Sequence, residues 1–147
     1  MLPKSLALVS TLLCASAPAN SGAVRQDRLI GVTEIRAALS GKAIAYAPEG
    51  WADAGIHEEF HESGIWKGIY YSRGPGRFSG RWTVVGDRLC VTPDRRTIVA
   101  RWFEGNRCRS IWRGSKSGAL KIEHLSPRFA KSGPLSVSIT DLNSSGR

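Results

Sequence analysis

The chain has 147 residues and a formal charge of +9, from 21 lysines and arginines against 12 aspartates and glutamates. This length leaves room for one compact domain and little more, which excludes a large multidomain enzyme. No repeat of a solenoid or propeller period is visible, and beyond the N-terminus no apolar run is long enough to span a bilayer.

Residues 1–23 have the pattern of a secretory signal peptide. A lysine near the start is followed by the uncharged apolar run "SLALVSTLLCASA" and then by small residues, which favours cleavage after Ala19 or Ala23. A lipoprotein signal with Cys14 as the lipidated residue is disfavoured, because the residue before it, Leu13, is not small. We therefore expect a periplasmic or secreted protein.

Three further segments follow the signal peptide. We expect a flexible lead-in over residues 24–32, a single β-rich domain over residues 33–140 and a disordered tail over residues 141–147. The domain should begin with one short helix, "TEIRAALS", because Ile35 and Leu39 stand four residues apart. In this prediction Thr33 is the N-cap and the following glycine ends the helix.

The stretch His-Glu-Glu-Phe-His, which begins at residue 57, matches the zinc-protease pattern H-E-x-x-H. That pattern needs a helix, since on a strand His57 and His61 stand about 13 Å apart, too far to share a metal. In the longer form of the pattern the third ligand falls at Lys67, whose ammonium has no lone pair to offer. We interpret "IHEEFH" as a strand running into the turn "ESG". His57 and His61 are then false-positive candidates for metal ligands, and we expect no cofactor. A short helix over residues 51–62 is the alternative, and its internal glycine argues against it.

Residues 78–85 alternate as a strand with one apolar face, which carries Phe78 and Trp82 as predicted core aromatics. The pair Gly86-Asp87 predicts a two-residue hairpin loop, with glycine first as a type II′ turn prefers. In that register Val84 meets Leu89 and Trp82 meets Val91, so that apolar side chains face one another.

Further strands are predicted after this hairpin. "TIVARWFEGNRCRSIWR" repeats the arrangement around Gly105-Asn106, while "ALKIEHL" and "LSVSITDL" supply the remaining strands. The predicted fold is mainly β: an antiparallel meander of about six to eight strands with one short N-terminal helix, as a half-open barrel or a curled sheet.

Two cysteines remain after signal cleavage, Cys90 and Cys108, and an even pair in a small exported domain predicts a disulfide. A predicted strand over residues 97–104 would separate the two cysteine strands by about 9.6 Å in a flat meander. A disulfide needs Cα atoms within about 7 Å. Either the intervening segment is an excursion, or the sheet curls sharply, or the thiols stay free; we expect the bridge.

The run from Phe60 to Cys108 resembles a family of small exported alphaproteobacterial proteins that carry a domain of unknown function. The resemblance rests on Phe60 with the following "ESG", on "GRFSGRW" and "VGDRLC", and on the second cysteine in "RCRSIW". It implies export and a small β domain, and it brings no activity or catalytic residues. The chain departs from the family pattern in the long segment "VTPDRRTIVARWFEGN" between the cysteines.

Ten arginines crowd residues 73–113 and alternate with tryptophans and tyrosines, including Trp66 and Trp102. Guanidinium groups suit phosphates and carboxylates, and aromatic rings stack on sugars or lipid rings. Strand alternation alone would also place aromatics inside and arginines in water. The candidate anion-binding residues are Arg77, Arg81, Arg88, Arg101, Arg107 and Arg109.

We therefore expect a non-enzymatic envelope protein that binds an anionic or amphipathic envelope component. The alternative is a protein-binding module that contacts another envelope protein, such as an inhibitor of an acidic cell-wall enzyme. A zinc hydrolase acting through "HEEFH" is a remote third alternative. Nucleic acid is disfavoured as a partner because the chain is predicted to be exported.

Overall fold

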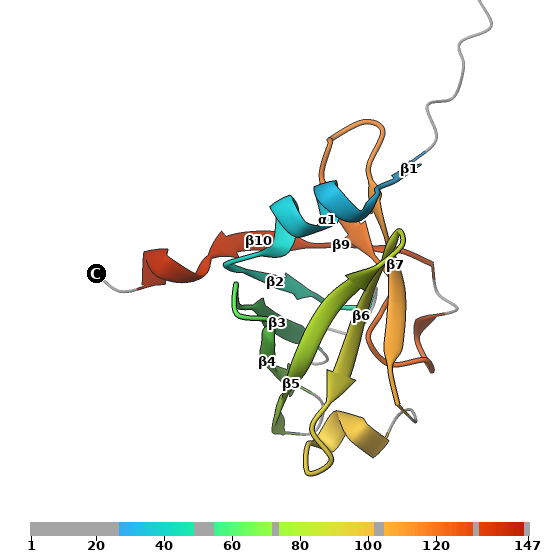
Figure 1. The fold of residues 1–147 in the computed structure, drawn as a ribbon. Coiled ribbons are helices and arrows are strands. Elements are labelled where there is room, and N and C mark those ends of the chain that lie inside the picture. The colour runs from blue at the N-terminus through green and yellow to red at the C-terminus, as the bar shows by residue number, and fades with distance from the viewer. Residues whose placement is uncertain (1–26, 49–54, 72–73, 102–104, 131–132, 146–147) are drawn as a thin grey trace, which may run out of the picture.

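The computed structural model describes residues 27–48, 55–71, 74–101, 105–130 and 133–145 (Figure 1). The predicted signal peptide lies outside these ranges, as does Trp102. Within them, no helix combines the length and the hydropathy that a membrane crossing requires.

Ten antiparallel strands form one sheet in the described part of the chain. The strands are β1 (Arg28–Leu29), β2 (Lys42–Tyr46), β3 (Ile56–Phe60), β4 (Ile65–Tyr71), β5 (Pro75–Val85), β6 (Arg88–Pro93), β7 (Arg107–Arg113), β8 (Leu120–Ile122), β9 (Leu135–Ser136) and β10 (Ser138–Asp141). The helical elements are α1 (Val32–Leu39) and the short 3-10 helices η1 (Ile98–Arg101) and η3 (Leu142–Ser145).

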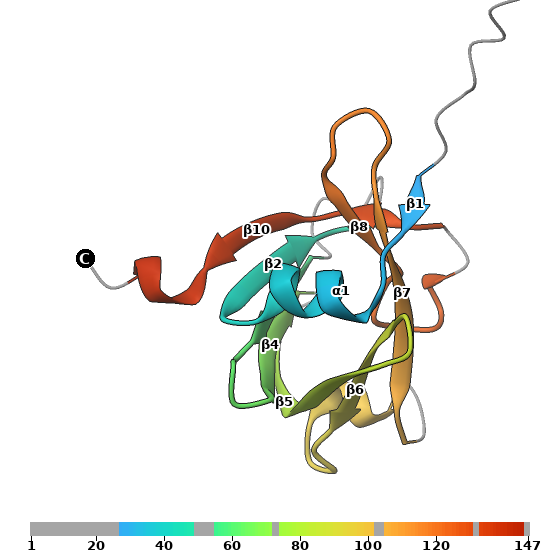
Figure 2. The ribbon, with the colours of Figure 1, turned by 45° about the horizontal axis from the view of Figure 1, so that its top comes forward.

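The sheet curls into a nearly closed barrel, which confirms the predicted mainly β, antiparallel fold (Figures 1 and 2). Its strand order is β10-β2-β3-β4-β5-β6-β7-β8-β9, and β1 pairs with β7 beside this path. The two end strands, β9 and β10, are separated only by Val137, whose N–H donates to the carbonyl of Leu120 (3.0 Å). Residues 135–141 therefore pair first with β8 and then with β2, and bring the two ends of the sheet together.

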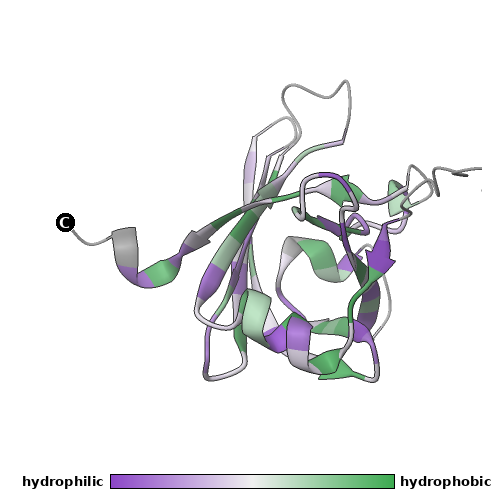
Figure 3. Cartoon of the chain, turned by 90° about the horizontal axis from the view of Figure 1, so that it is seen from above, coloured by the Kyte–Doolittle hydropathy of each residue, from purple (hydrophilic) through white to green (hydrophobic). Residues whose placement is uncertain are grey.

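Strand alternation explains where the core lies. Apolar and polar positions alternate along the strands (Figure 3), and in β3 the buried positions are Ile56, Glu58 and Phe60. In β5 the buried face carries the predicted core aromatics Phe78 and Trp82, which confirms that assignment. The inward-facing side chains of the strands thus fill one shared interior.

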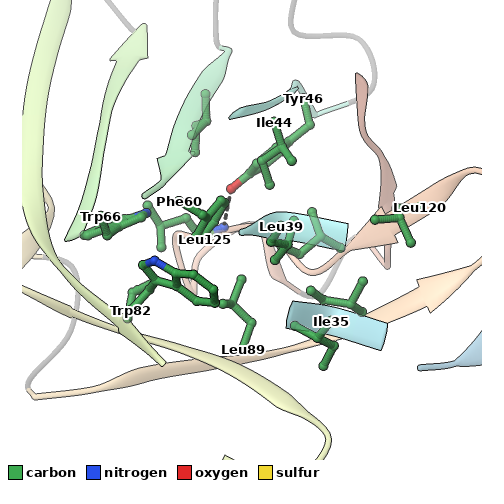
Figure 4. Close-up of a cluster of buried hydrophobic side chains, with 14 of the residues drawn as sticks. Ile35, Leu39, Ile44, Tyr46, Phe60, Trp66, Trp82, Leu89, Leu120 and Leu125 are labelled. Atoms are coloured by element: carbon green, nitrogen blue, oxygen red, sulfur yellow. Dashed lines mark hydrogen bonds between the residues drawn. The ribbon is translucent and has the colours of Figure 1, made fainter. Parts of the chain in front are cut away.

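The interior is covered at two ends by helical elements. The close-up in Figure 4 shows Ile35 and Leu39 of α1 pointing into the same interior as the indoles of Trp66 and Trp82. At the opposite end, at the bottom of Figure 1, η1 contributes the fully buried Val99 to the core. The helix α1 and the 3-10 helix η1 thus cover the two ends of the core.

Helix α1 begins at Val32, and its N-cap lies two residues before the predicted one. Its N-cap is Gly31 in an extended conformation, with no side-chain cap hydrogen bond, and Thr33 lies inside the first turn. The carbonyl of Gly31 accepts the first intrahelical bond from the N–H of Ile35 (2.9 Å), and glycine is among the residues found at N-caps. The predicted end is close: Leu39 is the last helical residue, and Gly41 adopts a φ of 71°, which favours glycine.

The hairpin predicted at Gly86-Asp87 is confirmed. Strands β5 and β6 pair with Val84 opposite Leu89 and Trp82 opposite Val91, and Gly86 has a φ of 59°. The turn chemistry and the apolar register specified the same pairing.

The predicted disulfide is also confirmed, and no strand of the described chain lies between β6 and β7 to separate the two cysteines. Cys90 and Cys108 lie directly opposite each other on β6 and β7, with Cα atoms 3.9 Å apart and the sulfurs bonded. The predicted strand over residues 97–104 is wrong: residues 98–101 form η1, and 102–104 lie outside the described residues. The segment between the cysteines is therefore an excursion, which leaves β6 and β7 free to pair.

The structure differs from the predicted boundaries of the domain at both ends. Within the predicted lead-in, β1 pairs with β7 and the N–H of the fully buried Ile30 donates to the carbonyl of Ile111 (3.0 Å). Within the predicted tail, Asp141 ends β10 and pairs with Lys42, and Leu142 donates to the carbonyl of Gly41 (3.0 Å). Pairing to the sheet orders both segments as far as they are described.

Candidate functional site

The "HEEFH" stretch is a strand, as predicted, and its side chains divide between two faces. In β3, Glu58 points into the core, while His57 and Glu59 lie on the outer face, as does His61 directly after the strand. The Nε2 of His61 lies 3.1 Å from one oxygen of Glu59, and the Nε2 of His57 lies 3.6 Å from the other. Among the described residues, no three histidine, cysteine, aspartate or glutamate side chains are placed to hold a metal ion.

Inside the barrel, Glu58 pairs with Arg109 of β7, and both side chains are fully buried. The guanidinium donates one hydrogen bond to each carboxylate oxygen, both of 2.7 Å. The carboxylate also accepts from the hydroxyl of Tyr46 (2.5 Å) and from the indole Nε1 of Trp66 (2.8 Å). The Tyr46 hydroxyl in turn accepts from the N–H of Leu125 (3.2 Å), the bond dashed in Figure 4.

These contacts keep the buried pair ionised. Burial alone raises the pKa of Glu58, but the charge of Arg109 and the hydrogen bonds to the carboxylate outweigh burial and hold this pKa below its ordinary value. Burial lowers the pKa of Arg109, but the charge of Glu58 outweighs burial and raises it above the ordinary value. Burial and the nearby carboxylate raise the pKa of Tyr46 well above its usual range, so Tyr46 remains a neutral donor.

His124 completes the buried polar cluster. Its ring lies edge-on to Tyr46, with centroids 5.6 Å apart, and its Nδ1 accepts from the N–H of Ser126 (2.9 Å). The neutral ring therefore carries its proton on Nε2, which has no hydrogen-bond partner in the part of the chain that the structure describes. Burial, and then the charge of Arg109, lowers the pKa of His124 to about 4.

The six candidate anion-binding arginines fall into two groups. Arg109 is committed to Glu58, and Arg107 donates to the carbonyls of Leu125 (3.2 Å) and His124 (3.3 Å). Arg88 donates to the carbonyl of Cys108 (2.9 Å) and lies 3.7 Å from Glu123. These three side chains therefore have partners within the protein. The remaining candidates have exposed side chains that form no ion pair with a described residue: Arg77, Arg81 and Arg101.

One of the exposed arginines, Arg77, lines a groove of about 700 Å³ beside η1. Its other basic residues are Lys67, Arg95 and Arg96, and none of the four forms an ion pair with a described residue. We call this surface the cationic groove. Its two acidic side chains are Glu59, flanked by histidines, and Asp94, which accepts a hydrogen bond from Ser79 (2.6 Å). The basic side chains are therefore left to face a ligand.

The sequence builds the cationic groove from a strand pair and a turn. The β4–β5 register places Lys67 opposite Ser79 on the outer face, so Lys67 and Arg77 lie on adjacent strands. The N–H of Asp94 donates to the carbonyl of Ser79 (2.9 Å), and the N–H of Thr97 donates to the carbonyl of Asp94 (2.9 Å). This turn fixes the backbone on either side of two consecutive arginines and holds them beside β5.

No family model, curated protein or solved structure matches this chain. The family resemblance of residues 60–108 therefore stays a prediction, and the cationic groove has to be interpreted from its own chemistry.

Sequence reasoning did not include three members of the groove among the candidates. Lys67 entered only as a failed zinc ligand, and Arg95 and Arg96 lie just before residues 97–104, which were predicted as a strand. The signal for Lys67 was its alternation with the inward-facing Trp66 and Gly68 on β4. The signal for the two arginines was the run "PDRRT", whose proline and aspartate are turn residues and whose proline ends β6.

Proposed function

We propose that this protein is an exported, non-enzymatic envelope protein that binds an anionic ligand in the cationic groove. The observation that supports this most directly is that four basic side chains, none paired with a described residue, line one depression. Its volume, about 700 Å³, lies in the range of small-ligand sites. Guanidinium forks and a lysine ammonium match the oxygens of a phosphate or sulfate group.

Export is part of this proposal through the predicted signal peptide and the disulfide, which persists in an oxidising compartment. The absence of catalysis is proposed from the chemistry of the site. In the cationic groove, Asp94 accepts a hydrogen bond from Ser79 and Glu59 lies beside two histidines, while Glu58 and His124 are buried inside the barrel. In the envelope, phosphate-bearing lipids and acidic glycans are the anions that such a groove would meet.

Titration of the mature protein with inorganic triphosphate at low and high salt, followed by calorimetry, tests the proposal. We expect Arg77→Glu to weaken binding at least tenfold, because it removes one charge-assisted contact and adds a repulsive charge. Arg81→Glu is the matched control, since Arg81 lies on the same face of β5 but outside the groove. Binding should also weaken steeply as salt rises.

An interface with an acidic protein would give a different result. In that case triphosphate would not bind measurably, and capture of a protein partner would depend less on salt than anion binding does. Equal losses in Arg77→Glu and Arg81→Glu would show that the whole basic surface, and not the groove, attracts the anion.

A further inference from the structure

The cationic groove does not end at β4. A second groove, of about 680 Å³, lies beside it over β2, β3 and β4, and the two share Glu59 and Ile69. The second groove has no lysine or arginine among its described lining residues: its lining includes Ala45, Ala47 and Ile69, with His57, Glu59 and Ser138 as polar members. We call it the apolar groove. The shared residues make the two grooves one continuous depression that changes from basic to apolar.

The strand register explains this change. One row of outward-facing residues crosses four strands: Ala45 of β2 pairs with His57, His57 with Ile69, and Ile69 with Arg77 of β5. Adjacent strands lie about 4.8 Å apart, so the row spans about 14 Å from its small apolar end to its guanidinium end. A ligand that lies along this row meets the methyl group of Ala45 first, then the imidazole of His57, then the side chain of Ile69 and last the guanidinium of Arg77.

The acidic side chain at the junction does not oppose this arrangement. Glu59 stands opposite Lys67 in the β3–β4 register but forms no ion pair with it. One oxygen of Glu59 lies 3.1 Å from the Nε2 of His61, which follows β3, and the other lies 3.6 Å from the Nε2 of His57. The carboxylate is therefore associated with β3, while Lys67 and Arg77 on the neighbouring strands are left for a ligand.

We propose that the joined grooves hold one anionic single-chain amphiphile, a lipid with a phosphate headgroup. Its phosphate lies among Lys67, Arg77 and Arg96, and its alkyl chain runs over Ile69 toward Ala45. This proposal rests on the proposed anion-binding function and adds that the apolar chain contributes to affinity. Charge complementarity fixes the direction of the ligand, because the basic side chains lie only at the β5 end.

Binding of dodecyl phosphate, butyl phosphate and dodecyl maltoside, each below its micelle concentration, tests the proposal by calorimetry. We expect dodecyl phosphate to bind at least tenfold more tightly than butyl phosphate, since each methylene added in an open groove gives about a twofold gain. Dodecyl maltoside, which has the same chain without the charge, should bind at least tenfold more weakly than dodecyl phosphate.

Variants separate the two halves of the site. Ala45→Glu should remove the gain from chain length and leave butyl phosphate binding within twofold, whereas Arg77→Glu should weaken both phosphates. Ala47→Glu, at an exposed position of the apolar groove, gives the same test if Ala45→Glu does not fold. Val85→Glu is the control, because Val85 is an exposed apolar residue outside both grooves.

The outcomes distinguish the proposed amphiphile from the proposed anion-binding function. Equal affinity for butyl and dodecyl phosphate, both lost in Arg77→Glu, would overturn the amphiphile and leave the anion site in place. Equal affinity for dodecyl phosphate and dodecyl maltoside, or binding only above the micelle concentration, would show unspecific detergent adsorption and would also overturn it. Failure of every phosphate to bind would overturn both.

Discussion

Arg109 and Glu58 face each other across the interior of the barrel, joined by two hydrogen bonds of 2.7 Å, with no exposed surface on either side chain. The two residues lie 51 positions apart in the sequence. The indole of Trp66 and the hydroxyl of Tyr46 complete the hydrogen bonding of the carboxylate. Four strands, β2, β3, β4 and β7, are therefore connected through one ion pair.

Breaking this ion pair should be strongly destabilising. Arg109→Met leaves the Glu58 carboxylate buried without its counter-charge, and we expect a loss of about 3–5 kcal/mol in the free energy of unfolding. The double variant Glu58→Leu/Arg109→Met should lose less than the sum of the two single changes, because neither charge remains. Denaturant melts measure this, with the exposed Arg81→Met as control. Additive losses would mean that the two side chains act independently.

The "HEEFH" stretch gives a second prediction: replacing the glutamate should matter more for stability than replacing either histidine, whereas in a zinc site the histidines would hold the metal. We expect no stoichiometric zinc after dialysis, as measured by elemental analysis. His57→Ala and His61→Ala should change stability by less than about 0.5 kcal/mol, since both histidines lie on the outer face. Glu58→Ala should cost several kcal/mol, because Arg109 loses its partner. One zinc per chain, lost in either histidine variant, would contradict the strand interpretation.

Stability should fall as the pH is lowered from about 6.5 to 4. The pKa of His124 is lowered to about 4 in the folded protein, so the unfolded chain binds the proton more tightly and acid favours unfolding. For this histidine alone the loss reaches about 3 kcal/mol at pH 4. The lowered pKa of Glu58 adds a loss in the same direction below about pH 4.5.

The variant His124→Asn separates the two contributions. An asparagine oxygen can replace Nδ1 as the acceptor for the N–H of Ser126 but does not titrate. The free energy of unfolding, measured by urea melts from pH 7 to pH 4, should therefore depend less on pH in the variant than in the unchanged protein. Parallel pH profiles would show that His124 is not the responsible group.

Reduction of the Cys90–Cys108 bridge should lower stability by about 3 kcal/mol, the chain-entropy cost of opening a loop of this size. The bridge joins residues that are 18 positions apart, and the excursion through η1 lies inside that loop. Thermal melts with and without reductant measure the loss. The double variant with serine at both positions should be insensitive to reductant; a shift in that variant would point to an effect unrelated to the bridge.

Trp82→Ala should destabilise by about 3–5 kcal/mol. Trp82 is only 7% exposed, packs edge-on against Phe60 with ring centroids 5.6 Å apart, and donates from Nε1 to the carbonyl of His61 (2.8 Å). Trp82→Phe retains most of the packing and should lose clearly less. Equal denaturation midpoints for Trp82→Ala and the unchanged protein would contradict the core assignment.

The elements that were predicted correctly are determined by residues close together in the sequence. The hairpin at Gly86-Asp87 follows from the turn residues and from apolar alternation within ten neighbouring positions. The strand at Ile56–Phe60 follows from the same alternation, which outweighed a motif match. In both places the residues that decide the structure lie next to one another in the chain.

The Glu58–Arg109 pair was missed because it depends on a long-range contact. A signal for it was present, since Glu58 alternates in phase with Ile56 and Phe60, and Arg109 alternates in phase with Ile111. Two opposite charges on apolar strand faces indicate a buried partnership, since either charge alone would be costly to bury. The 3-10 helix at residues 98–101 had no comparable signal, because a helix of four residues has no periodicity to detect.

The continuous segment from Leu135 to Asp141 has a consequence for the order in which the fold can form. Because this one segment pairs with both β8 and β2, a chain that lacks it leaves both strands with open edges. Open edges invite pairing with other chains, so a polypeptide still being synthesised, or cut before residue 135, is exposed to aggregation. The two ends of the sheet can therefore be joined only after residues 135–141 have been synthesised, and this joining couples the C-terminal residues to the strand that follows α1.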